Sequence, residues 1–352
     1  MSDDVSAPTE LPRDSEARRR LQMADIARLA GVSVSTVSRA LNGSTLVNTE
    51  TRERIALLAR ELNYSINLGA KNLRLQRTQT IAVVIPYDSV SRQNVTDPFF
   101  LSMLGSLADA ITDRGYDMLL SRVDAERLDT AARLIDSGVA LGVVIIGQWR
   151  HHDQLNAMAA RRLPIVVWGA QLPQQLYCTV GGDNVRGGAI AVEHLLSQGR
   201  RRIVFLGDPQ LPEVGHRFDG YRAALAAAGI AAQPPLELAV PFEPGAARAA
   251  VSALLDAGVA FDAVFGCSDL LAISAMQVLR ERGVDVPRQV AVVGYDDMSL
   301  ATYCDPPLSS VHQPVADAAV QLTDALVAML DGQAVAPRTL PVSLVVRRSS
   351  AA

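Results

Sequence analysis

Short polar side chains and one arginine are clustered in the segment GVSVSTVSRALN, residues 31–42. Ser33 can act as a helix N-cap, because its hydroxyl can accept a hydrogen bond from a backbone N–H of the following turn. A helix that begins there presents Val34, Ser35 and Thr36 on its first turn, from which side chains can reach base edges in a major groove. The chemistry that this spacing permits is recognition of a nucleic acid.

Arg39 lies one turn further along the same helix, where a guanidinium can pair bidentately with guanine or contact a phosphate. Ser38 and Asn42 offer short polar groups for contacts to the DNA backbone. The same residues could also form the solvated face of an ordinary helical hairpin, because helix-glycine-helix patterns are common.

Apolar residues at helical spacing lie on both sides of Gly31 and predict two short helices joined by a tight turn. A third helix is expected over 49–64, capped by Asn48 or Thr49. The apolar positions of this helix-turn-helix pattern are Met23, Ile26, Ala27 and Ala30, then Val34, Val37 and Leu41, then Ile55, Leu58 and Leu62.

Charge is distributed unevenly along the chain. Residues 17–80 carry eleven Lys and Arg against four Asp and Glu, whereas the whole chain of 352 residues has a net charge of −4. The remainder therefore carries about −11, and this asymmetry is typical of a nucleic-acid-binding end on an acidic body. The basic segment NLGAKNLRL, 67–75, could form only about two helical turns, which are marginal in isolation.

Short Val/Ile-rich runs alternate with longer Ala/Leu-rich stretches after residue 80, which predicts parallel strands joined by helical crossovers. Continuously apolar runs indicate strands covered on both faces. Such a series is too long for one compact domain, so we expect two doubly wound lobes with a boundary near 181–188 and a ligand cleft near the strand carboxyl ends. The expected strands are 81–86, 117–123, 142–147, 164–169, 202–208, 263–269 and 290–296.

Taken together, these features resemble the lac repressor and purine repressor family of bacterial transcription factors. The resemblance is carried by DIARLAGVSVSTVSRALNG, TRERI, ELNY, NLGAKNLR and TIAVVIP, and continues through DPFF, GDN..GG, EHLL..GRRRI, R..GY, SDLLA, VVGYDD and PPLSSV. It implies a homodimer that binds a pseudo-palindromic DNA operator through its N-terminal domains. It also implies a small-molecule effector in the core, usually a sugar or a nucleobase.

The resemblance implies a hinge helix whose Leu73 inserts into the minor groove at the centre of the operator, with Ala70 packed beside it. An apolar wedge of this kind costs a few kcal/mol of unstacking, which the contacts of the bent DNA offset. Arg74 could reach into the groove or hold a phosphate. From the residues alone, Leu73 could equally be a core residue of a linker helix.

The domain boundaries follow from the same resemblance. They are a disordered leader (1–20), a helix-turn-helix domain (21–66), the hinge helix (67–77) and an effector-binding and dimerisation core (78–352) similar to periplasmic sugar-binding proteins. Crossings between the lobes are expected near Gly181, Val311 and Gly332. The first lobe would then hold about 78–180 and 312–332, and the second about 181–311 and 333–352.

Within the core, the resemblance implies ligand contacts by Arg217 and Asp296. A guanidinium suits vicinal hydroxyls or a carboxylate, and a carboxylate can accept hydrogen bonds from two hydroxyls. Ser268 occupies a position of polar ligand contacts, and Gln313 lies in a segment that joins the lobes. Arg217 could instead pair with Asp219 on the surface, and Asp296 could cap the following loop.

Phe99 and Trp168 could form an apolar wall for a sugar face, or they could be core residues. The strand 164–169 departs from the family by ending in Gly169, where several members place an acidic ligand contact. That contact is then absent, or it moves to Asp183.

An enzyme and a sugar-binding transport component are the alternative classes of protein. Neither GxGxxG after the first strand nor GxxxxGK[ST] is present, and the five histidines lack zinc-site spacing, so we expect no catalytic residue, metal or cofactor. The polar N-terminus lacks the apolar stretch of a secretory signal, and no membrane span is expected. The three cysteines indicate reduced thiols. Together these features predict a cytoplasmic protein.

The expected function is a repressor of a carbohydrate-utilisation operon, with a purine- or nucleoside-responsive regulator as the alternative. The effector and the sign of its effect stay open.

Overall fold

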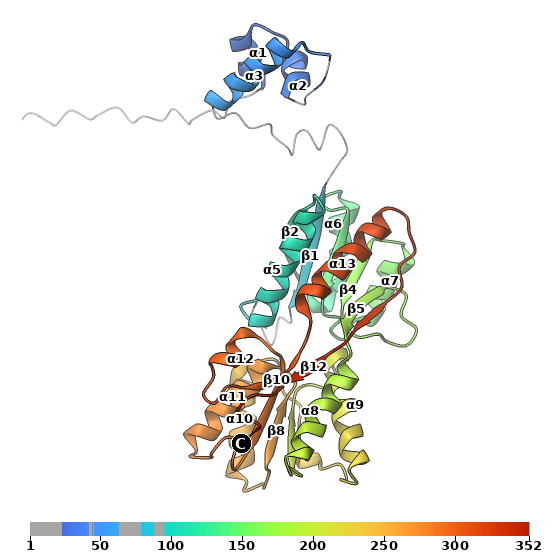
Figure 1. Ribbon diagram of the computed structural model, residues 1–352. Coiled ribbons are helices and arrows are strands. Elements are labelled where there is room, and N and C mark those ends of the chain that lie inside the picture. Colours follow the sequence, from blue (N-terminus) through green and yellow to red (C-terminus); the bar gives the residue numbers. More distant parts are fainter. Residues whose placement is uncertain (1–22, 42–43, 45, 63–78, 88–94, 352) are drawn as a thin grey trace, which may run out of the picture. The chain divides into compact units, whose positions relative to one another are not determined.

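The computed structural model describes residues 23–41, 44, 46–62, 79–87 and 95–351, which belong to two compact units divided after residue 77 (Figure 1). Within these ranges, no helix is long and apolar enough to cross a membrane. The expected leader and hinge helix lie outside the described residues.

The N-terminal unit consists of α1 (Met23–Ala30), α2 (Val34–Leu41) and α3 (Thr49–Glu61) around the fully buried side chains of Ile26, Val37 and Ile55. Gly31 has a φ of +67°, a conformation that glycine adopts at no steric cost, and so permits the turn between α1 and α2. Asn48 caps α3, since its Oδ1 accepts a hydrogen bond from the Thr51 N–H at 2.8 Å. The predicted three-helix core is confirmed, except that Val34 is exposed and does not join it.

The first lobe of the second unit is built on a parallel sheet with the order β11-β5-β4-β3-β1-β2. Its strands are β1 (Thr80–Tyr87), β2 (Asp117–Asp124), β3 (Gly142–Ile146), β4 (Ile165–Trp168), β5 (Cys178–Gly182) and β11 (Arg338–Leu340). Its helical segments are α5 (Pro98–Asp113), η1 (Ala125–Ala131), α6 (Ala132–Asp136), α7 (His152–Ala160) and α13 (Val315–Leu330).

Alternate residues of β1 show how helices cover both faces of this sheet. Ile81, Val83 and Ile85 pack with α5 and α13, whereas Ala82 and Val84 pack with η1, α6 and α7. All five side chains are at most 1 % exposed, as the unbroken apolar run predicts.

The second lobe contains a sheet with the order β12-β10-β9-β8-β6-β7, in which only β12 is antiparallel to its neighbour. Figure 1 shows α8 and α9 on one side of this sheet and α10 and α11 on the other. The strands are β6 (Ile203–Leu206), β7 (Glu237–Leu238), β8 (Ala263–Gly266), β9 (Ala291–Asp296), β10 (Ser309–His312) and β12 (Ser343–Val345). The helical segments are α8 (Asn184–Ser197), α9 (Pro212–Ala227), η2 (Pro234–Leu236), α10 (Pro244–Asp256), α11 (Asp269–Glu281) and α12 (Ser299–Tyr303).

The chain passes between the lobes after β5, after β10 and after β11. The third crossing corrects the expected boundary at Gly332, because residues 338–340 pair with Val180–Gly182 in the first sheet. Leu340 also joins the core of the first lobe. The crossing therefore lies between β11 and β12, and both α13 and β11 belong to the first lobe.

Candidate ligand cleft and nucleic-acid interface

Ser33 organises the start of α2. Its Oγ accepts a hydrogen bond from the Thr36 N–H at 3.1 Å and lies 2.8 Å from both Ser35 Oγ and Thr36 Oγ1. The predicted N-cap is confirmed, and it fixes the first turn of α2.

The two faces of α2 have different surroundings. Val37 and Ala40 are buried in the three-helix core, while Val34, Ser35 and Arg39 are exposed and Thr36 and Ser38 are half-buried. All five of these predicted contact residues therefore lie on surface-accessible parts of α2. The other predicted DNA contacts, Asn42, Ala70, Leu73 and Arg74, lie outside the described residues.

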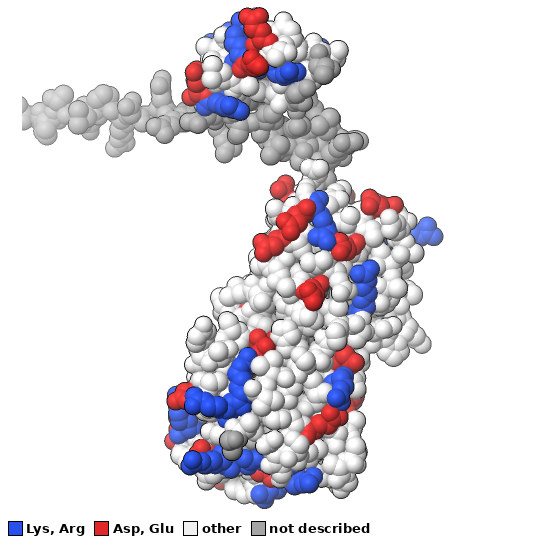
Figure 2. All heavy atoms as spheres, viewed as in Figure 1, with Lys and Arg blue, Asp and Glu red and all other residues white. Residues whose placement is uncertain are grey.

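Basic and acidic side chains lie close together on the visible face of the N-terminal unit (Figure 2). The part of this unit that the structure describes carries five Arg and four Asp or Glu. Most of the predicted positive surplus comes from Arg18, Arg19, Arg20, Lys71, Arg74 and Arg77, which flank that part on both sides.

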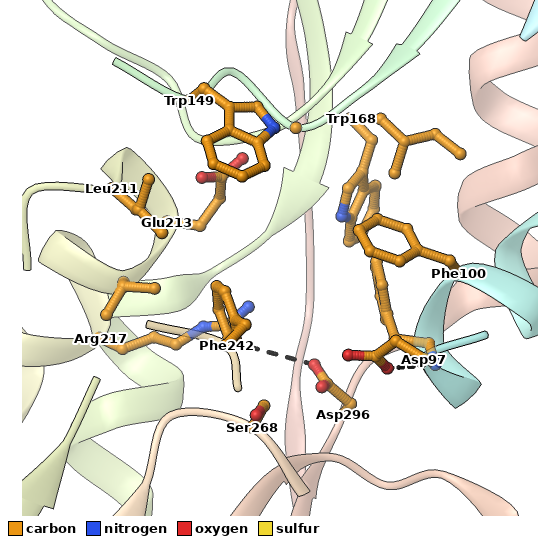
Figure 3. Close-up of a pocket in the computed structure, with 14 residues that line it drawn as sticks. Asp97, Phe100, Trp149, Trp168, Leu211, Glu213, Arg217, Phe242, Ser268 and Asp296 are labelled. Atoms are coloured by element: carbon orange, nitrogen blue, oxygen red, sulfur yellow. Dashed lines mark hydrogen bonds and ion pairs between the residues drawn. The ribbon is translucent and has the colours of Figure 1, made fainter. Parts of the chain in front are cut away.

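The candidate ligand cleft lies between the two lobes of the second unit and holds about 650 Å³, including space open to solvent (Figure 3). Its walls come from the carboxyl ends of β3, β4, β8 and β9, from the first turns of α5 and α9, and from connecting loops. Ligand sites of doubly wound sheets form at these strand ends. The lining residues are Asp97, Phe99, Phe100, Ile146, Gly147, Trp149, Trp168, Leu211, Glu213, Val214, Arg217, Phe242, Ser268 and Asp296.

Arg217 is held rigidly on α9 with only 5 % of its surface exposed. Its Nε donates to Asn184 Oδ1 at 2.8 Å, its Nη1 donates to the Cys267 carbonyl at 2.5 Å, and its guanidinium lies 3.7 Å from the ring centroid of Tyr295. These contacts leave some guanidinium N–H groups free to donate to a ligand.

Two glycines bring α8 and α9 into backbone contact around this arginine. A Cβ atom on Gly188 would lie 2.0 Å from the Arg217 carbonyl oxygen, and one on Gly220 would lie 2.0 Å from the Val185 carbonyl oxygen. Only glycine permits so close an approach, and the contact fixes the backbone from which Arg217 extends.

Asp296 faces Arg217 across the floor of the cleft, with Oδ1 3.9 Å from Nη1. The same oxygen accepts a hydrogen bond from Gln313 Nε2 at 2.7 Å. Burial raises the pKa of the Asp296 carboxyl well above its ordinary value, although the charge of Arg217 acts against the shift. Asp296 has a φ of +102°, a strained conformation for a residue other than glycine, and such strain concentrates at ligand sites.

Aromatic rings form the walls of the cleft. Phe99 and Trp168 lie with ring centroids 6.2 Å apart and planes tilted by 37°, while Trp149 lies across the cavity from Phe242 in Figure 3. Trp149 has a φ of +49°, and the neighbouring Gln148 anchors its loop through hydrogen bonds to both backbone groups of Ala170.

The structure brings five of the seven predicted ligand residues into the cleft lining: Phe99, Trp168, Arg217, Ser268 and Asp296. Gln313 reaches the site only through Asp296. Asp183 lies outside the lining. Its Oδ1 caps α8 by accepting a hydrogen bond from the Arg186 N–H at 2.9 Å. Gln148 occupies the space beside Gly169, where a Cβ atom would lie 2.7 Å from its side chain.

Sequence reasoning did not identify Asp97, Trp149, Leu211, Glu213 or Phe242 as lining residues. A signal was available for two of them. Trp149 follows a predicted strand at its carboxyl end, and Glu213 precedes Arg217 by four residues, which places both on one face of a helix.

Comparisons with known proteins agree in both units. Residues 22–67 match the family model "Bacterial regulatory proteins, lacI family", and residues 192–350 match "Periplasmic binding protein-like domain". The HTH-type transcriptional regulator CelR of Thermobifida fusca is 34 % identical over 345 residues, covering 95 % of this chain and 99 % of that protein.

Two solved structures cover almost the whole chain. A CelR-cellobiose complex is 32 % identical, covers 94 % of this chain and 100 % of its own, and has a TM-score of 0.70. The lac repressor dimer bound to operator and the anti-inducer ONPF is 25 % identical, covers 95 % of this chain and 100 % of its own, and has a TM-score of 0.83.

Proposed function

The chain belongs to the lacI family of bacterial regulatory proteins, and we propose that a sugar bound in the interlobe cleft changes its affinity for operator DNA. As a family member it is a ligand-responsive, DNA-binding transcriptional regulator and not an enzyme. We assign to it the role of a cytoplasmic homodimeric repressor of a carbohydrate-utilisation operon.

The pairing of Arg217 with Asp296 carries the proposal of a sugar effector. The two side chains place a fork of N–H donors and a carboxylate acceptor 3.9 Å apart on the cleft floor, between aromatic walls. Vicinal hydroxyls can both accept from the guanidinium and donate to the carboxylate, while the apolar face of a sugar ring packs against an aromatic ring. The solved complex of CelR with cellobiose supports this class.

The exposed first turns of α2 form the proposed major-groove surface. In this assignment Val34, Ser35 and Thr36 read base edges, and Arg39 contacts guanine or phosphate. Ser38 and Asn42 contact the DNA backbone, and Ser33 positions the helix as its N-cap. The minor-groove wedge of Leu73, with Ala70 and Arg74, is proposed from the family resemblance.

The mechanism follows from a cleft whose two walls belong to different lobes. An effector that contacts both walls stabilises one relative orientation of the lobes over another. The chain enters the first lobe from the DNA-binding unit, so a change in lobe orientation can change the geometry of the hinges in a dimer. Linkage then requires operator DNA to change effector affinity by the same factor.

The proposal is tested by fluorescence anisotropy with the full chain, a pool of labelled palindromic operators and a salt series. Each titration is repeated with glucose, cellobiose, ribose, adenosine and guanine. We expect salt-steep, sequence-specific binding that one of the sugars shifts. A shift by adenosine or guanine alone would replace the sugar with the purine or nucleoside alternative, and specific binding that no compound shifts would remove the effector proposal.

A further inference from the structure

Glu213 is a cleft residue with unused hydrogen-bonding capacity. It lies in the first turn of α9, one turn before Arg217, and its Oε1 is buried with no hydrogen-bond partner among the described residues. In Figure 3 its carboxyl group points to the Trp149 side of the cavity. A buried acceptor without a partner costs free energy, so a ligand that supplies a donor at this point gains affinity.

The cleft lining is unbalanced in charge. Asp97, Glu213 and Asp296 contribute three carboxyl groups, and in the described part of the chain Arg217 is the only cation that lines the cavity. Burial raises the pKa of Glu213 and of Asp97, because their surroundings solvate a negative charge poorly. An anionic group of a ligand would meet the same poor solvation, in a cavity whose lining holds more carboxyl groups than cations.

The position of Glu213 gives it a role distinct from that of Asp296. Asp296 already has Arg217 and Gln313 as partners, whereas Glu213 Oε1 has none. The Gln148 backbone N–H of the opposite lobe is among the groups that lower the pKa of Glu213, so the carboxyl lies where the two lobes meet. A ligand hydroxyl that donates to Oε1 would therefore supply the hydrogen bond that this oxygen lacks, at the place where the two lobes meet.

We propose that Glu213 is a specificity determinant that accepts a hydrogen bond from an effector hydroxyl and restricts the effector to neutral, hydroxyl-rich compounds, excluding carboxylate- and phosphate-bearing sugars. This inference rests on the proposed function of the same cleft. The inference limits the effector to uncharged compounds, whereas membership of the family alone sets no limit on the effector's charge.

The test compares neutral sugars with their anionic counterparts by isothermal titration calorimetry on the full chain. The pairs are glucose with glucuronate, cellobiose with its uronate, cellobiouronate, and ribose with ribose 5-phosphate. For the pair whose neutral member binds, we expect at least about tenfold weaker binding of the anion, because one uncompensated charge contact is worth more than about 1.4 kcal/mol.

Glu213→Gln removes the charge and keeps the shape, and should reduce this discrimination by about tenfold. Asp219→Asn makes the same charge change at an exposed position of α9 and should leave the ratio unchanged. Glu213→Asp keeps the carboxyl group but moves its oxygens away from the cavity, because the side chain is shorter. This variant should bind the neutral sugar more weakly and should still exclude the anion. It serves as the informative variant if Glu213→Gln does not fold.

The outcomes separate this inference from the proposed function. If an anionic sugar binds the wild type as tightly as its neutral counterpart, the proposed role of Glu213 is wrong, while the sugar effector remains. The same conclusion follows if the ratio of neutral to anionic affinity is unchanged in Glu213→Gln. Absence of binding by every sugar, neutral or anionic, overturns the sugar effector and this inference with it.

Discussion

Arg150 and Asp208 form an ion pair between the lobes, joining the loop after β3 in the first lobe to the loop after β6 in the second. Asp208 is only 17 % exposed at its side chain, while Arg150 is 53 % exposed. The pair adjoins Trp149, so one short loop both lines the cavity and connects the lobes. It is a contact that opening of the cleft must break.

Replacing Arg150 with Ala should therefore weaken effector binding. An exposed ion pair contributes about 0.2–1 kcal/mol, so the expected loss is roughly 1.5- to 5-fold, and it should shrink at high salt. Calorimetric titration of the effector at low and high salt measures it. Arg161→Ala removes a similar pair, with Asp136, that lies within the first lobe, and should not change affinity. Equal effects of the two variants would contradict a role in closure.

Replacing Arg217 with Ala should abolish the effector response and leave operator affinity largely intact. The variant loses the ligand donors and leaves Asp296 without its counter-charge, so we expect at least about a 100-fold loss of effector affinity. Operator anisotropy with and without effector is the measurement. Arg222→Ala removes an exposed arginine from the same helix and should respond like the wild type. A normal response of Arg217→Ala would take this residue out of the site.

Replacing Leu73 with Ala should weaken specific operator binding on the order of tenfold or more and nonspecific binding much less. The reason is that a minor-groove wedge acts only where the operator is bent. Parallel titrations with operator and scrambled duplexes measure both affinities. Leu57→Ala, an exposed leucine of α3, is the control. Equal losses for the two duplexes would contradict the wedge assignment.

Asp269 should make stability depend on pH. Burial raises the pKa of its carboxyl to about 7, although hydrogen bonds from Ser310 Oγ at 2.5 Å and the Met298 N–H at 2.7 Å act against the shift. Because the folded-state pKa lies above the unfolded value of 3.8, the folded form binds the proton more tightly and is stabilised below pH 4.

That stabilisation is lost as the pH rises from about 4 to 7, by at most about 1.4 kcal/mol per pH unit. Asp269→Asn should flatten this part of the curve when the free energy of unfolding is measured by denaturant titration. Asp317→Asn, at an exposed position on α13, should leave the slope unchanged. If the free energy of unfolding of Asp269→Asn changes with pH as steeply as that of the wild type, the pH dependence arises from other carboxyl groups. Asp296 would then be the first of these to test.

Replacing Gly188 with Ala should destabilise the second unit by roughly 1–3 kcal/mol and weaken effector binding, because the new Cβ atom would press on the Arg217 backbone. Thermal unfolding and effector titration measure the two effects. Gly105→Ala is the matched control, since Gly105 lies in α5 with nothing within 4 Å of the added atom. That variant should gain about 0.5–1 kcal/mol from improved helix propensity. A neutral Gly188→Ala would show that α8 and α9 can separate freely.

Strands with unbroken runs of Val and Ile could be predicted from the sequence, because burial on both faces leaves a clear apolar pattern. The predictions for β1, β3, β4, β6, β8 and β9 are confirmed to within a few residues. The prediction for β2 is also confirmed, although β2 is a partly exposed edge strand without such a run. β5, β10 and β11 could not be predicted in this way. They contain Gly, Ser, Arg and Thr, and their strand conformation depends on pairing with neighbours that are distant in the sequence.

The candidate site was predictable where a residue follows a predicted strand or matches a family motif. Arg217, Ser268 and Asp296 are of this kind, and all three line the cleft. Glu213 and Trp149 had weaker signals, namely the spacing of four residues from Arg217 and a place shortly after a predicted strand, and neither matches a quoted family motif. Trp149 further depends on a left-handed backbone that its residue type does not suggest.

The adjacency of β11 and β12 has a consequence for biosynthesis. Residues 338–340 complete the first sheet and residues 343–345 complete the second, so both lobes lack a strand until the same short stretch has left the ribosome. The three helices of the N-terminal unit, with a core of their own, can form far earlier. A nascent chain would thus acquire its helix-turn-helix long before it acquires a completed core, and the two lobes would mature together as translation passes the last crossing.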